Sequence, residues 1–160
     1  MNEAFKQLKT YLDEAMAVQT ALVLFEWDDA TLAPKAAGEN TSRVIEILSG
    51  QYFKAMTGDE TKALVRQCLQ DPSGLNEVEL AQVKEMEEQI GQLDCIPKEE
   101  YQAFAKLSSE SVRIWEEAKE QNDFKRFAPT LKKVVEYQKK FASYRAKEGQ
   151  SQYDALLKDY

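Results

Sequence analysis

Large apolar residues recur along the first part of the chain at steps of mostly three or four positions. The members of this stripe are Leu8, Leu12, Met16, Leu22, Val23 and Trp27. Such spacing places side chains on one face of an α-helix, so it predicts a helix over residues 2–27. Pro34 and Gly38 then indicate a loop over residues 29–38.

The same spacing continues through the rest of the chain. It predicts four more long or medium helices and one short helix, over residues 39–56, 64–69, 76–93, 97–121 and 129–148. Gly74 and Gly149 follow the predicted ends of two of these helices, and the last helix is predicted to begin at Pro129. Single turns are expected at residues 124–127 and 153–160. No stretch alternates with a two-residue period, so no strand is predicted.

Local signals mark two of the helix starts. Asn76 is followed three positions later by Glu79, the pattern of a capping box. Leu75 and Leu80 are spaced for a hydrophobic staple around the same start. Pro97 suits the first position of the next helix, where its missing N–H costs no hydrogen bond.

These elements predict an all-α fold, with residues 1–160 forming one helical domain of five to six helices packed as an antiparallel bundle. A chain of 160 residues that is 43% hydrophobic can bury roughly 68–70% of the surface that its unfolded form exposes. The longest wholly apolar run, residues 21–25, is far too short for a membrane span, and no membrane partner is expected. The first residues also lack the pattern of a secretory signal.

The two cysteines, Cys68 and Cys95, are too few for a disulfide framework. Both fall in stretches that are predicted to be helical, where a lone cysteine is usually a small core residue. A reactive thiol is the alternative. A reducing cytoplasm is the location that this cysteine content favours.

Charge is unevenly distributed in a chain with 21 basic and 28 acidic side chains. Residues 124–148 hold eight basic and two acidic side chains, and Lys132-Lys133 and Lys139-Lys140 recur seven positions apart on one helix face. A nucleic-acid-binding face is one interpretation. Solvation, or pairing with the acidic helices, is the other. The net charge of −7 favours the second, because a negative field repels a polyanion. No nucleic-acid partner is therefore expected.

The chain contains no histidine. This excludes a Ser-His or Cys-His nucleophile pair and a histidine-ligated zinc site within these residues. The adjacent acids Glu87-Glu88 and Glu116-Glu117 do not converge on one ligand. No calcium loop or glycine-rich phosphate loop occurs. No catalytic, metal-binding or cofactor-binding residue is predicted from the residues themselves.

The most unusual local sequence is Leu24-Phe25-Glu26-Trp27-Asp28-Asp29. The favoured interpretation places Trp27 in the core, with the acids capping the following turn or pairing with an arginine such as Arg43. The alternative is that the tryptophan and its flanking carboxylates line a cleft at the end of the helix.

Four segments of the chain, at residues 21–28, 96–99, 118–136 and 153–160, resemble stretches of the carboxypeptidase Taq family of metallocarboxypeptidases. Ala21–Asp28 resembles the LLEWD stretch in the first helix of that family, and Ile96–Glu99 is similar to a helix start that contains proline. Ala118–Glu136 is similar to a segment with the pattern NDF followed by FAP, and Tyr153–Tyr160 resembles the YDALL stretch. The four segments occur in the order of the family and span essentially the whole chain.

The resemblance implies an almost wholly helical metallocarboxypeptidase that uses zinc, or alternatively cobalt, to remove C-terminal amino acids from peptides. The HExxH metal motif of the family, with its downstream glutamate, lies after the point where this chain stops. The chain is therefore expected to be the N-terminal, non-catalytic lid side of a longer enzyme, inactive alone. Homodimers are also implied, with peptides as substrates of the intact enzyme only.

Two departures from the family pattern stand out. Residues 33–38 replace a turn that usually contains Met-Pro-Pro-Gly, and Gln152 replaces a common proline. The alternative function is a stand-alone helical interaction module without enzymatic activity, for which Trp27, Trp115 and the seven tyrosines would supply contact surface.

Overall fold

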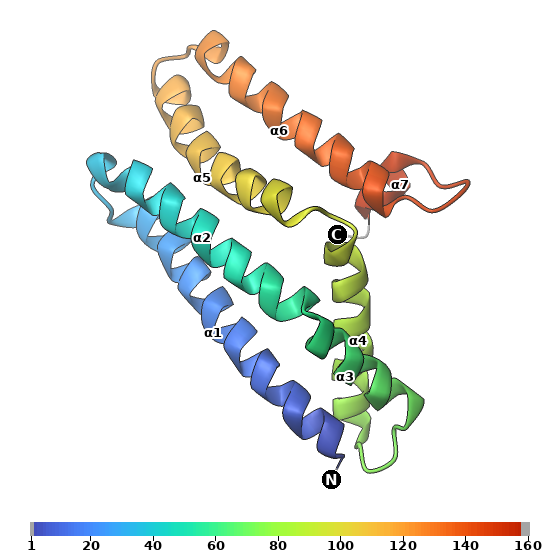
Figure 1. The fold of residues 1–160 in the computed structure, drawn as a ribbon. Helices are drawn as coiled ribbons and strands as arrows, with labels where there is room; N and C mark the ends of the chain where they lie inside the picture. The colour runs from blue at the N-terminus through green and yellow to red at the C-terminus, as the bar shows by residue number, and fades with distance from the viewer. Residues whose placement is uncertain (1, 158–160) are drawn as a thin grey trace.

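The computed structural model describes residues 2–157, and their regular structure is entirely helical (Figure 1). The elements are α1 (Glu3–Thr31), the 3-10 helix η1 (Lys35–Ala37), α2 (Gly38–Thr57), α3 (Asp59–Gln70), α4 (Glu77–Asp94), α5 (Lys98–Glu120), α6 (Phe124–Arg145) and α7 (Gln152–Leu156). No strand occurs in this range, so the predicted all-α fold is confirmed. Within the same range, no helix has the apolar length that crossing a membrane requires.

Four of the helices form a layer (Figure 1). α1, α2, α5 and α6 lie side by side in that order, and each runs antiparallel to its neighbour. α3 and α4 stand at the end of the layer where α1 begins and α2 ends, and α7 packs on α6. The expected antiparallel packing of neighbouring helices is therefore present.

The main hydrophobic core lies at the end of the layer that α3 and α4 cover. Its buried members are Ala4, Phe5, Leu8, Ala15, Met56, Val65, Cys68, Val83, Met86 and Ile90. α1 contributes only through its first half, since Ala15 is the last of its buried residues. The second half of this 29-residue helix therefore extends beyond the core.

α2 and α5 are held together by small side chains and polar contacts. The Ser42 and Ser109 hydroxyls lie 3.0 Å apart across the interface, and Ser42 Oγ also donates to the Gly38 carbonyl at 2.9 Å. Gln102 Nε2 donates to the Glu46 carbonyl at 3.1 Å. These bonds satisfy polar groups that close helix packing would otherwise leave unpaired.

Two glycines of α2 make this approach possible. A Cβ atom added at Gly38 would lie 2.1 Å from Arg113 Nη1, and one added at Gly50 would lie 2.1 Å from Gln102 Nε2. A side chain at either position would therefore require the side chain of Arg113 or Gln102 to move from its place in the interface. The space beside each glycine is therefore filled by a side chain of α5.

The predicted capping box at the start of α4 is confirmed. Asn76 Oδ1 accepts from the Glu79 N–H at 2.9 Å, and Glu79 Oε2 accepts from the Asn76 N–H at 2.9 Å. Leu75 packs against the core beside this start. Pro97 takes the N-cap position of α5, one residue earlier than predicted.

The predicted break before Pro129 is wrong. α6 runs without interruption from Phe124, and Pro129 lies inside it. The helix begins early because Asp123 accepts a hydrogen bond from the Arg126 N–H and caps its first turn. Elsewhere, α1 and α3 extend beyond their predicted bounds and α6 stops short of its own, at Arg145. The last predicted turn is α7, although residues 158–160 lie outside the described range.

Gly50→Ala is expected to lower the free energy of unfolding by about 1–2 kcal/mol, because the new methyl group must displace Gln102 and break its bond to Glu46. Gly91→Ala is the matched control, since a Cβ added there meets no atom within 4 Å. It should stabilise the protein by about 0.5–1 kcal/mol through helix propensity. Urea unfolding followed by circular dichroism measures both, and equal effects would contradict the close α2–α5 contact.

Candidate functional site

The described residues offer no set of ligands for a catalytic metal. Within residues 2–157, no three or more Asp, Glu or Cys side chains come together in a group that could hold an ion, and the sequence has no histidine. Glu117 instead forms an ion pair with Arg126 across the α5–α6 turn. These residues therefore do not fit the metal centre of a metallopeptidase, and no metal-dependent step is assigned to them.

The cysteines do not form a reactive centre either. Cys68 is fully buried, as predicted for a core residue, and Cys95 is half-buried with its thiol donating to the Gln92 carbonyl at 3.3 Å. Burial raises the pKa of both thiols. A raised pKa lowers the thiolate fraction at neutral pH and so lowers nucleophilicity.

Part of the basic segment 124–148 pairs with α5. Lys140 Nζ lies 2.6 Å from Glu100 Oε1, and Arg126 contacts Glu117. The hydrogen bond to Glu100 is the main cause that raises the pKa of Lys140. For these two side chains the structure agrees with pairing to an acidic helix.

The expectation that Trp27 lies in the core is wrong. Trp27 is 57% exposed and Leu24 is 61% exposed, because the second half of α1 extends beyond the core. The turn after α1 is closed by the Asp28 backbone carbonyl, which accepts from the N–H groups of Leu32 and Ala33 at 2.9 and 2.8 Å. Among the described residues, Arg43 makes no ion pair with the acids of this stretch.

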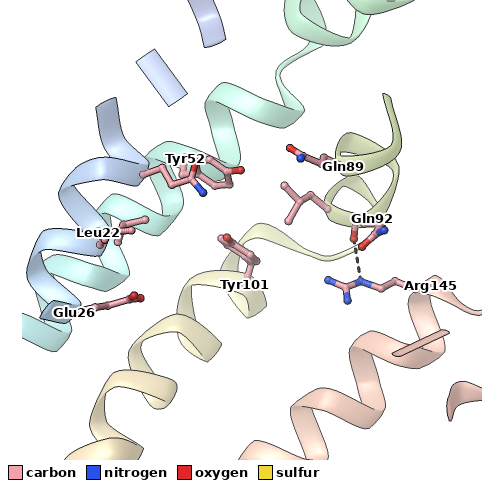
Figure 2. Close-up of a pocket in the computed structure, with 10 residues that line it drawn as sticks. Leu22, Glu26, Tyr52, Gln89, Gln92, Tyr101 and Arg145 are labelled. Carbon is pink, nitrogen blue, oxygen red and sulfur yellow. Dashed lines mark hydrogen bonds between the residues drawn. The ribbon is translucent and has the colours of Figure 1, made fainter. Parts of the chain in front are cut away.

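Two acids of the same stretch, Glu26 and Asp29, line the wall of a groove, whereas Trp27, which the alternative interpretation placed there with them, does not. One hollow of about 550 Å³ lies between α1 and α5, with α2 contributing Ile45 and Ser49. A second hollow, of about 510 Å³, shares Leu22, Glu26 and Tyr101 with the first (Figure 2). We call the two adjoining hollows the α1–α5 groove.

The two ends of the α1–α5 groove differ in chemistry. The first hollow is lined mainly by apolar or small side chains, which include Leu22, Ala30, Ile45, Phe104, Ala105, Ser108 and Val112. The second is more polar, with Gln19, Gln89 and Gln92 beside apolar residues such as Val23 and Leu93. There Arg145 Nε donates to the Gln92 carbonyl at 3.3 Å (Figure 2).

Tyr101 stands where the two hollows meet. Its ring packs against Phe53, with the ring centres 5.3 Å apart. Burial is the main cause that raises the pKa of Tyr101 to about 12, and burial also raises the pKa of Tyr52 in the same wall. Both phenols are therefore neutral at physiological pH. They can donate hydrogen bonds but supply no charge.

The groove can therefore bind a ligand or pack against another protein segment. None of its lining residues is a nucleophile activated by a base. Sequence reasoning missed the small residues Ala105 and Ser108, which line the groove from α5. The sequence does contain a signal for these two residues, because their spacing places them on one face of the α5 helix with Tyr101, Phe104 and Val112. By itself, however, this helical spacing predicts only a stripe of residues that faces a core.

Sequence comparisons find similarity to carboxypeptidases. Residues 7–160 match the family described as carboxypeptidase Taq (M32) metallopeptidase. Carboxypeptidase 1 of Bacillus subtilis is 37% identical over an alignment of 142 positions, which covers 86% of this chain and 27% of that protein. Thermostable carboxypeptidase 1 of Pyrococcus furiosus is 29% identical over 167 residues, covering 99% of this chain and 32% of that protein.

Solved structures show the same relation. The structure named BsuCP superimposes with a TM-score of 0.94 at 30% identity, covering 99% of this chain and 32% of that chain. A Pyrococcus furiosus carboxypeptidase superimposes with a TM-score of 0.78 at 29% identity, covering 100% of this chain and 32% of that chain. The chain thus spans about a third of the length of the relatives that it matches.

The buried Tyr101 phenol should make stability fall at high pH. Its pKa in the folded state is about 12, above the ordinary value of 10.0, so it stabilises the fold fully below pH 10 and loses this contribution as pH rises toward 12. The expected loss is roughly 2–3 kcal/mol. Urea unfolding at pH 9 and pH 12 measures it.

Tyr101→Phe should remove most of this pH-dependent loss, because phenylalanine has no proton to release. Tyr153→Phe is the control, since Tyr153 is 71% exposed and lies outside the groove. A Tyr101→Phe protein that loses as much stability as the unmodified protein between pH 9 and pH 12 would contradict the assignment.

Proposed function

Because the chain belongs to the carboxypeptidase Taq (M32) metallopeptidase family, we propose that it is the N-terminal helical portion of a zinc-dependent metallocarboxypeptidase. The intact enzyme removes C-terminal amino acids from peptides. In this proposal residues 1–160 are one helical domain that forms the non-catalytic lid side of the substrate groove. The intact enzyme is cytoplasmic and homodimeric, and its metal ligands lie outside these residues.

One observation carries the proposal. The family match covers residues 7–160, yet the sequence contains no histidine and the described residues contain no ligand cluster. A hydrolytic zinc centre needs three protein ligands and a bound water that it can activate. A chain that spans about a third of its relatives and lacks those ligands is best explained as a helical portion of the enzyme that does not contain the metal site.

The alternative is a stand-alone interaction module. Its contact surface would be the exposed aromatic side chains at the end of the layer opposite the core, which are Trp27, Trp115 and Phe124. Exposed aromatic residues are typical of the centres of protein interfaces. The same exposure is expected where one part of a protein packs against another, so it does not by itself favour the module.

A chimera tests the proposal. Residues 1–160 replace the matching third of Bacillus subtilis Carboxypeptidase 1, and activity is measured as metal-dependent release of the C-terminal residue from N-blocked dipeptides. We expect the chimera to be active with added zinc or cobalt. The chain of 160 residues, at the same concentration and with the same metals, should release no amino acid.

Two outcomes would count against the proposal. Metal-dependent release by the 160-residue chain would show that it carries its own catalytic centre. A folded but inactive chimera would show that this chain cannot serve as the helical portion of such an enzyme. The unmodified Bacillus subtilis protein, assayed in parallel, controls for the metal and the substrate.

A further inference from the structure

The apolar hollow of the α1–α5 groove has the shape of a binding site for one more helix. We propose that an amphipathic helix from the part of the longer enzyme outside these 160 residues lies in it. The apolar face of that helix packs over α2 and α5, and a lysine or arginine on it faces α1. This inference rests on the proposed function, because it takes the chain to be one portion of a longer protein.

The shape of the hollow supports a helix. α2 lies between α1 and α5, so the two outer helices form walls and α2 forms the floor. Small side chains line the hollow, among them Ala30, Ser49, Ala105 and Ser108. Small residues let a packed helix approach within the usual 8–10 Å between helix axes. The volume of about 550 Å³ is left open because no described helix covers α2 on this side.

The surface of the hollow also favours an apolar occupant. Leu22, Phe104 and Val112 line it, and Val112 is 45% exposed although it lies on the groove face of α5. Burying such side chains removes apolar surface from water, which stabilises the packed state. Ser109 is already bonded to Ser42, so its hydroxyl does not require a polar partner from the occupant.

Two carboxylates predict the charge of the occupant. Glu26 and Asp29 lie on the α1 wall of the hollow, and no residue of the described range forms an ion pair or hydrogen bond with either side chain. A helix laid in the groove would take both away from water. Buried carboxylates without a partner are strongly destabilising, so the occupant should present a basic side chain to them.

The occupant is a helix of the same polypeptide rather than a second copy of this chain. In a two-fold interface through the groove the second copy's groove would have to supply the basic side chain, and none of the residues that line the apolar hollow is a lysine or arginine. The solved BsuCP chain, in contrast, contains about twice as much further polypeptide as the third that this fold matches at a TM-score of 0.94. That further polypeptide must pack on a surface of this third, and the core end is already covered by α3 and α4.

Cysteine labelling in the chimera tests the groove. Ser108→Cys should react freely with a maleimide in the 160-residue chain, because Ser108 is exposed there. In the chimera its rate should fall about tenfold or more, since a packed helix must move away before the thiol can react. Ser143→Cys is the matched control, an exposed serine of α6 that lines neither hollow. Mass spectrometry of the labelled peptides reports both rates.

The outcomes separate this inference from the proposed function. Equal rates for Ser108→Cys in the chain and in the chimera would overturn the docked helix, whether or not the chimera is active. An inactive chimera with a protected Ser108→Cys would contradict the proposed function and support the docked helix. Protection in the 160-residue chain that rises with its concentration would show a second copy in the groove. Protection of the chimera only after peptide is added would show a substrate site.

Charge reversal tests the basic side chain. Asp29→Lys should lower the thermal midpoint of the chimera by about 3 °C or more, because it places like charges together, and should change that of the 160-residue chain much less. Asp13→Lys is the control, since Asp13 is an exposed acid on the same helix outside the groove. Equal shifts for Asp29→Lys in the two proteins would overturn the predicted pairing.

Discussion

The close packing of α2 against α5 is the contact on which the rest of the arrangement depends. It is possible because Gly38 and Gly50 leave room for Arg113 and Gln102, and because Ser42 can reach Ser109 across the interface. Since α2 occupies this position, α1 and α5 are separated by its full width. The groove between them is a direct consequence of that separation, not of a loop or an insertion.

The second constraint is that the hydrophobic core lies at one end of the helical layer. α1 is one uninterrupted helix, but its buried residues end at Ala15, and the side chains beyond it meet α2 and solvent. Hydrophobic burial therefore stabilises mainly the end of the layer with α3 and α4. The opposite end keeps Leu24 and Trp27 exposed. This division matches a unit that is stabilised at one end and packs against further polypeptide at the other.

Local features of the fold could be predicted from the sequence, and features that depend on distant segments could not. The start of α4 was predictable because Asn76 and Glu79 satisfy each other within one turn. The apolar stripe of α1 predicted the helix, but not that the core would end halfway along it. Pro129 failed as a boundary because the cap at Asp123 starts α6 earlier. The groove requires three helices to be placed together, so no single segment could reveal it.

The absence of histidine in the sequence bears on how packing in the groove depends on pH. Tyr101 and Tyr52 in the groove wall are neutral at physiological pH, as any phenol is, and burial raises the pKa of each still further from that range. A group that titrates near pH 7, such as histidine, would make the packing of that wall depend on pH. If the proposed helix packs in this groove, the neutral phenols and the apolar side chains of the lining make its packing independent of pH near neutrality.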